Sequence, residues 1–136
     1  MSDFLGMDEL MAAFDALVRK AAEADILIVK RAEAVVEKNI KKQFKQAHSK
    51  KTPTPSPAGS PPAVISGNLR RGITSDPVSM EGLTAVGRVY PTAVYARIQE
   101  LGGDRIPARP YVQPGYDASK AEIEKIAVVE WAKATR

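Results

Sequence analysis

Apolar residues recur at helical spacing over the first third of the chain, from residue 8 to about residue 48. These positions follow one another at three- and four-residue steps and share one helix face: Leu10, Phe14, Leu17, Ala21, Ala24, Ile28 and Val35. Asp8 can cap the start of this helix, and no proline or glycine interrupts the chain between Met7 and Thr52. The pattern predicts one long helix within residues 1–49, about 60 Å long at 1.5 Å per residue. The alternative, two shorter helices that fold back on each other, has no visible turn residue.

The middle of this helix is apolar on almost every side, in the run Ile26-Leu27-Ile28-Val29. A helix whose apolar surface exceeds one stripe usually packs against another chain. We therefore expect Ile26 and Ile28 to contact a partner.

A proline-rich stretch follows the helix, with five prolines in the ten residues from Pro53. Proline lacks a backbone donor and restricts the residue before it, so neither a helix nor a central strand is expected here. Residues 50–66 are predicted to form an extended linker or arm. A ligand for a proline-recognising domain is the alternative reading of this stretch.

The hydrophobic period changes to two from Asn68 onward. Residues 68–74 and 83–90 alternate in polarity, and turn-forming residues separate them, so two or three antiparallel strands are predicted. The class is therefore α+β, with a small antiparallel sheet of two to four strands.

Two helices are expected after the strands. Pro91 would open a short helix from Thr92 to Glu100, which stops at Gly102 and Gly103, and a final helix would begin near Asp117. Residues 67–136 would form a small α+β domain that makes one structural domain with the N-terminal helix.

Composition narrows the functional classes. The 136-residue length fits one domain, and 44% hydrophobic residues can supply a core. The absence of cysteine excludes disulfides and thiolate chemistry. No apolar run approaches the roughly 20 residues of a membrane span, and the start of the chain lacks the pattern of a signal peptide. We therefore expect no membrane partner and a reducing, aqueous compartment.

The positive charge is concentrated in one segment. The net charge is +4, yet residues 30–51 hold eight Lys or Arg against Glu33 and Glu37, a local surplus of +6. This segment could contact DNA or an acidic partner, or it could be an ordinary solvated helix face. The candidate contact residues are Lys38, Lys41, Lys42, Lys45, Lys50 and Lys51.

Residues for catalysis are scarce. The single histidine, His48, lies among lysines beside the proline-rich stretch, where a solvated side chain is expected. No carboxylate pair shows the spacing of a metal loop, and no glycine-rich segment has the strand-to-helix context of a phosphate loop. We therefore expect no catalytic residues, no metal site and no cofactor.

Two arginine-containing segments are candidate partner contacts. They are residues 67–71, with Arg70 and Arg71, and residues 105–111, with Arg105, Arg109 and Tyr111. Arginine forms forked pairs with carboxylates, and a tyrosine offers a large, stiff contact surface. Alternatively, these arginines tie loops to the chain's own carboxylates.

Four short motifs follow one another along the chain. The first reads Pro61-Pro62, then Ser66-Gly67-Asn68-Leu69-Arg70-Arg71-Gly72-Ile73, and the second is Val86-Gly87 in a hairpin. The third is Tyr95-Ala96 followed by Glu100 and Gly102, and the fourth is Pro107-Ala108-Arg109-Pro110-Tyr111. In this order they resemble a family of small neck or tail-completion proteins of long-tailed, lambda-like phages, and the resemblance covers about residues 8–135. A related group of phage virion-morphogenesis proteins has a similar fourth motif.

The resemblance implies a structural virion protein, assembled in the bacterial cytoplasm, that forms a ring where capsid meets tail. Such a ring, expected with six-fold or twelve-fold symmetry, would be built of identical copies through two different, complementary patches. Its implied neighbours are connector or stopper proteins, the tail terminator or the tail tube. Any contact with packaged DNA would be to the backbone and therefore sensitive to salt.

Other functions fit the sequence less well. Within the same particle, the protein could be the tail terminator ring that stops tube growth. Outside it, the chief rival is a small, basic, sequence-independent nucleic-acid-binding protein, although no recognition helix or aromatic stacking strip is visible. An enzyme fits the sequence least.

Overall fold

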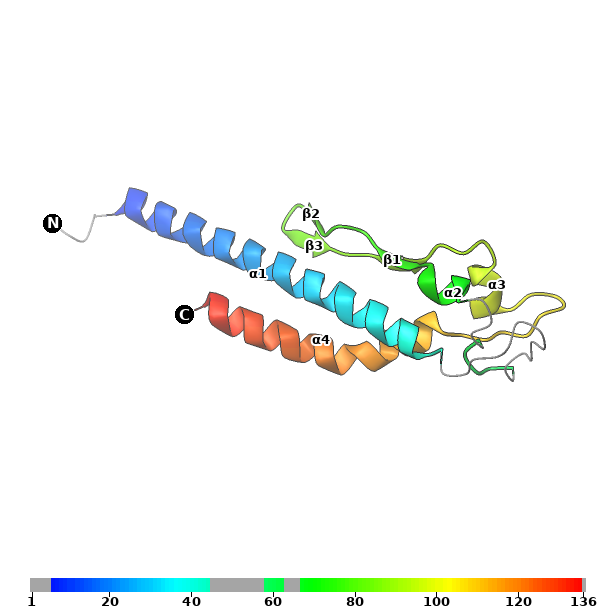
Figure 1. The fold of residues 1–136 in the computed structure, drawn as a ribbon. Coiled ribbons are helices and arrows are strands. Elements are labelled where there is room, and N and C mark those ends of the chain that lie inside the picture. The colour runs from blue at the N-terminus through cyan, green and yellow to red at the C-terminus, as the bar shows by residue number, and fades with distance from the viewer. Residues whose placement is uncertain (1–5, 45–57, 63–66, 136) are drawn as a thin grey trace.

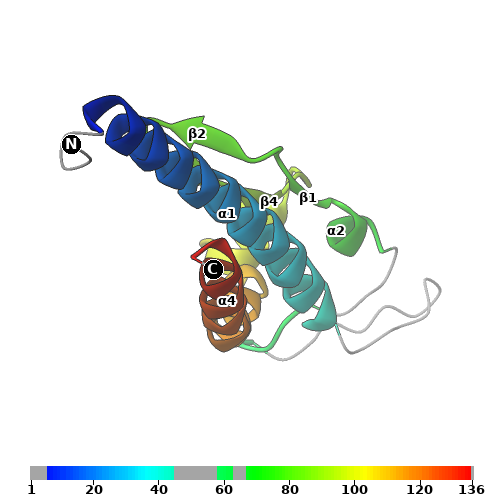
Figure 2. The same ribbon diagram turned by 90° about the vertical axis from the view of Figure 1, so that its left-hand side faces the viewer.

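The computed structural model describes residues 6–44, 58–62 and 67–135 of the chain. A single long helix, α1 (Met7–Lys42), runs through the molecule, with a second helix on one side and a β-hairpin on the other (Figures 1 and 2). The predicted α+β class is confirmed: a long N-terminal helix, small antiparallel sheets of two strands, a short helix and a C-terminal helix. The order of these elements is also as expected.

Helix α1 is unbroken over its 36 residues, so the alternative of two helices folded back on each other is wrong. At 1.5 Å per residue it is about 54 Å long. Acidic residues lie in its first turn and Lys41 and Lys42 in its last, which suits the helix dipole. The helix ends earlier than the predicted residue 48, and residues 45–49 lie outside the described part of the chain.

Helix α4 (Val112–Ala134) runs antiparallel to α1 and makes the most extensive contact between elements. An ion pair of 2.8 Å joins Arg31 to Glu130, whose side chain is buried. Nearer the other end, Asn39 donates a hydrogen bond of 2.8 Å to the hydroxyl of Ser119. The two helices are in close contact at Gly115, where an added Cβ would lie 2.5 Å from the Cα of Ile40.

The four strands make one long hairpin with a break in the middle. Strand β1 (Ile73–Ser75) pairs with β4 (Val89–Pro91), and β2 (Ser79–Glu81) pairs with β3 (Thr84–Val86), both antiparallel. Three residues separate β1 from β2 but only two separate β3 from β4, which is the one-residue mismatch of a bulge. The hairpin turns at Gly82, which has a positive φ of 64° that glycine adopts without strain.

The hairpin reaches α1 through Gly87. A Cβ at this position would lie 2.7 Å from Cγ1 of Val29 and 2.8 Å from Cγ of Glu33. The Val-Gly motif of the sequence therefore marks a point where the backbone between β3 and β4 packs against side chains of α1.

Residues 68–71 are helical rather than extended, which corrects the prediction of a strand from Asn68. The short helix α2 (Asn68–Arg71) follows Gly67, whose φ is 81°, and only Leu69 of this turn is buried. The N–H of Arg71 donates to the Gly67 carbonyl at 2.9 Å. A four-residue alternation with one buried residue suits a helical turn as well as a strand, so the local pattern did not decide between them.

The two later helices begin at other residues than predicted. Helix α3 (Ala96–Leu101) starts at Ala96 and not at the predicted Thr92. The backbone N–H and the hydroxyl of Thr92 both donate to the Gly72 carbonyl, so this residue prolongs the strand pairing instead. Helix α4 starts at Val112 instead of near Asp117, with Pro114 inside its first turn. A proline is tolerated there because its missing N–H would have no partner within the helix.

Candidate functional site

The main core lies at the C-terminal end of α1, and the first, third and fourth sequence motifs have residues in it. Buried side chains from α1, α2, β1, α3 and the start of α4 meet there: Ile40, Leu69, Ile73, Ala96 and Tyr111. The ring of Phe44 meets the ring of Tyr111 edge-on, with a centroid distance of 5.1 Å. We call this region the motif end.

Glu100 of the third motif holds the fourth motif in place. One carboxylate oxygen accepts the backbone N–H groups of Tyr111, at 2.7 Å, and Val112, at 2.9 Å, while the other accepts that of Gln113, at 2.9 Å. The next residue, Pro114, has no N–H to satisfy. A carboxylate distant in sequence therefore caps α4 completely, and its negative charge lies where the helix dipole favours it.

Tyr111 is a core residue rather than the contact surface that we expected, because its side chain is fully buried. Burial, with smaller effects of Glu100 and Tyr95, raises the pKa of Tyr111 to about 12. Its hydroxyl has no hydrogen-bond partner in the described residues. At neutral pH this group stays protonated, so it offers neither a base nor a nucleophile.

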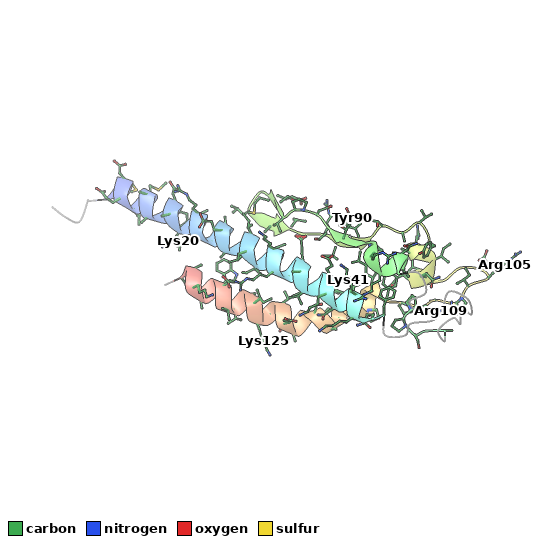
Figure 3. All side chains as sticks on the ribbon, viewed as in Figure 1. Lys20, Lys41, Tyr90, Arg105, Arg109 and Lys125 are labelled. Atoms are coloured by element: carbon green, nitrogen blue, oxygen red, sulfur yellow. The ribbon has the colours of Figure 1, made fainter. Side chains whose placement is uncertain are left out.

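The four arginines chosen from the sequence surround the motif end but differ in exposure. Arg70 and Arg105 are exposed, and Figure 3 shows Arg105 at the tip of the loop after α3. Arg71 is exposed as well, and its side chain donates to the Asn68 side chain at 2.6 Å. Arg109 is only partly exposed, and its backbone N–H donates to the Gln99 carbonyl at 2.6 Å. Three of the four arginines are thus exposed at the motif end, and Arg109 is partly covered by the chain.

The basic segment is partly neutralised by the chain itself. Lys41 pairs with Glu37 at 3.0 Å, and Lys38 lies 3.7 Å from Glu122 of α4. Lys42 is exposed at the end of α1, whereas Lys45, Lys50 and Lys51 lie outside the described residues. The described part of the segment is therefore less positive than the count of lysines indicates.

Of the two isoleucines expected to contact a partner, Ile28 packs inside the chain and is only 9% exposed, whereas Ile26 is 38% exposed. The larger apolar surface lies nearer the N-terminus of α1 and was not chosen as an interface from the sequence. These residues are 38–70% exposed: Met7, Leu10, Met11, Phe14, Leu17 and Val18. Their spacing was visible in the sequence, but only the length of α4 decides which part of the stripe is covered.

A groove of about 580 Å³ runs between α1, the hairpin and α4. Its lining is mainly apolar, with Val36, Val89 and Ile123 among its residues and Glu33 at its α1 wall. Burial, together with the nearby charges of Asp76 and Glu37, raises the pKa of Glu33 above 4.5 despite a hydrogen bond from the Arg88 backbone.

No set of three metal-binding side chains gathers within residues 6–44, 58–62 and 67–135. In the same part of the chain, no helix is long and apolar enough to cross a membrane. Comparison with protein-family models, with curated proteins and with solved structures produced no match. The functional argument therefore rests on the residues themselves and on their arrangement.

Proposed function

We propose that this protein is a structural component of a tailed-phage virion that forms a ring at the neck and joins the tail to the head. The single observation that carries the proposal is the ordered set of four motifs, which resembles the motifs of neck and tail-completion proteins. Each motif is short, and it is their order over nearly the whole chain that is specific.

The contacts between the motifs give the resemblance a physical basis. Glu100 of the third motif caps the helix that begins at the end of the fourth. Leu69 of the first motif and Ala96 of the third pack in the same core as Tyr111. Gly87 of the second motif permits the hairpin to touch α1. Residues that hold one fold together would persist in a family that shares this fold.

The surfaces of the molecule also fit a part of a larger particle. Apolar side chains are exposed along the N-terminal part of α1, as described above. At the motif end, Arg70 and Arg105 are exposed. Exposed apolar faces and arginines are typical of protein interfaces.

The experiment that tests this role is electron microscopy of particles assembled in infected cells without the protein. Full heads and complete tails that remain unjoined are expected. Overlong tails would instead identify a tail terminator, and normal virions would refute a structural role in the particle.

A second test uses the loop at the motif end. Arg105→Glu should leave a folded protein, because the exposed Arg105 lies at a loop tip, but should prevent the joining of heads to tails. Circular dichroism checks the fold, and plaque formation checks the joining. The matched control is Lys125→Glu on the outer face of α4 (Figure 3), which should keep joining intact; equal loss in both variants would count against a specific contact at Arg105.

A further inference from the structure

The groove between α1, the hairpin and α4 has the size and the lining of a small-molecule site. Its volume of about 580 Å³ lies in the range of roughly 300–1,000 Å³ that is common for such sites. Apolar and aromatic side chains of all three elements line it: Val29, Ala32, Val36, Val89, Tyr90, Tyr116 and Ile123. Because each of them belongs to a helix or a strand, the packing of these elements fixes the shape of the groove.

One acidic group at this groove is buried without a cationic partner. Glu33 is 8% exposed, and its carboxylate accepts a hydrogen bond from the backbone N–H of Arg88. The side chain of Arg88 does not neutralise it, because this side chain is 65% exposed and lies 3.9 Å from Glu81. Among the residues that the structure describes, no Lys or Arg forms an ion pair with Glu33.

A second carboxylate adds to the negative charge. Asp76 lies close enough to Glu33 to raise its pKa, and both residues line an adjoining hollow of about 600 Å³. The hydroxyl of Tyr90 donates a hydrogen bond of 2.8 Å to Asp76. Lys30 is exposed at the same hollow, but within the described ranges it forms an ion pair with neither carboxylate.

The hydrogen bond from Arg88 does not by itself require a charged side chain at position 33. A glutamine would accept the same backbone N–H and would avoid the cost of burying a carboxylate. A buried charge that has no cation inside the chain is instead stabilised by a cation that enters the groove from outside.

We propose that the groove binds a small organic cation with an apolar body. The ammonium or guanidinium group of this ligand pairs with Glu33, in the negative field that Asp76 increases. Its body packs against the apolar side chains and against the rings of Tyr90 and Tyr116. One face of Tyr116 already has Lys120 at 5.3 Å from the ring centroid, so the other face is the one left for the ligand.

The same residues disfavour other classes of ligand. An anion would be repelled by Glu33 and Asp76. A neutral apolar molecule would remove water from the carboxylate of Glu33 without supplying a partner. A sugar would find too few polar side chains in the lining to replace its hydrogen bonds with water.

This inference does not depend on the proposed function. The lining of the groove contains none of the arginines at the motif end, so the junction and the ligand use different residues. Failure of the cation to bind would leave the result of the microscopy unchanged, and normal virions would leave ligand binding unchanged.

NMR titration of the full chain with three probes of similar size tests the proposal. The probes are phenethylammonium, the neutral phenethyl alcohol and the anion phenylacetate. Phenethylammonium should bind about tenfold more tightly than the alcohol or better, because a buried charged pair adds to the same apolar contact. Its shifts should centre on Val29, Val89 and Ile123. Equal affinities for cation and alcohol, or no shift of these residues with the cation, would overturn the proposal.

The variant Glu33→Gln separates the charge from the shape of the groove. It keeps an acceptor for the Arg88 N–H, so it should fold, as circular dichroism checks. Its affinity for phenethylammonium should fall to that for the alcohol, while the affinity for the alcohol should not fall. Glu122→Gln is the matched control, because Glu122 is half-exposed on α4 and pairs with Lys38 at 3.7 Å. Unchanged binding of the cation by Glu33→Gln, or an equal loss in both variants, would refute the role of Glu33.

A fourth probe distinguishes a free ligand from a side chain of a partner protein. The capped tripeptide acetyl-Leu-Lys-Leu-amide carries the same ammonium group on a peptide. The free amine should shift the groove residues at lower concentration than the peptide does. Binding of the peptide at these residues, without binding of the amine, would assign the groove to a protein partner and overturn the small-molecule ligand.

Discussion

At the scale of single residues, the close approach of neighbouring elements explains two glycines that the sequence alone leaves unremarkable. Gly115 lies inside α4, where glycine normally costs about 1 kcal/mol of stability relative to alanine. The helix tolerates this cost because the Ile40 backbone of α1 occupies the space that a Cβ would need. At Gly87, a Cβ would instead meet the side chains of Val29 and Glu33, so glycine lets the hairpin backbone pack closely on α1.

We expect Gly115→Ala to destabilise the protein by about 1–3 kcal/mol, although alanine is the better helix former, because two backbones must move apart. Urea denaturation followed by circular dichroism measures the change. Gly103→Ala is the matched control, since a Cβ there meets only Ile98 at an ordinary 3.7 Å, and it should change stability little. Equal stability of Gly115→Ala and the wild type would show that the helices can separate freely.

The buried carboxylate of Glu33 makes stability depend on pH. Its pKa is raised in the folded state, mainly by burial, so the folded protein binds the proton more tightly than the unfolded chain does. The contribution of Glu33 to stability is therefore fully present below its ordinary pKa of 4.5 and is lost as the pH rises through the folded-state value.

Glu33→Gln should consequently be more stable than the wild type at pH 7, and the gain should shrink as the pH falls toward 4. Denaturation curves at several pH values give this difference directly. Glu122→Gln on the surface of α4 controls for the loss of one negative charge. A gain that is the same at every pH would mean that titration of Glu33 is not its source.

At the scale of elements, the ends of helices depend on residues far away in the sequence. The first N–H groups of α4 are satisfied by Glu100, eleven residues before the helix N-cap. Tyr111, which occupies the N-cap position, forms no side-chain cap. The start of α4 therefore could not be recognised from a local capping residue, and the later Asp117 looked like the better candidate.

Glu100→Ala should lower the free energy of unfolding by about 2 kcal/mol, because three N–H groups at a partly buried helix end lose a charged acceptor. Thermal and urea unfolding measure the effect. The comparable Glu122→Ala removes only a half-exposed ion pair of 3.7 Å and should cost about 0.5 kcal/mol or less. If Glu100→Ala lowered the free energy of unfolding by a similarly small amount, water would replace the Glu100 carboxylate as acceptor for these N–H groups without cost.

At the scale of the whole molecule, the chain has two ends of different character. The motif end contains the main core and carries exposed arginines. The opposite end is the N-terminal part of α1, where apolar side chains such as Phe14, at 59%, are exposed. The proposed junction with the rest of the particle uses the motif end, so Arg105→Glu should disturb the junction without changing the opposite end.

The sequence by itself determined the long helix, the hairpin and the α+β class, because these depend on periodicity and on glycine and proline, which act locally. It also displayed the complete apolar stripe of α1. Only the tertiary structure decided that Tyr111 is buried, that Glu100 caps α4 and that the stripe is covered at Ile28 but exposed at Phe14. The reason is physical: burial and capping depend on which distant segment lies opposite a residue, and the length of α4 sets where that cover ends.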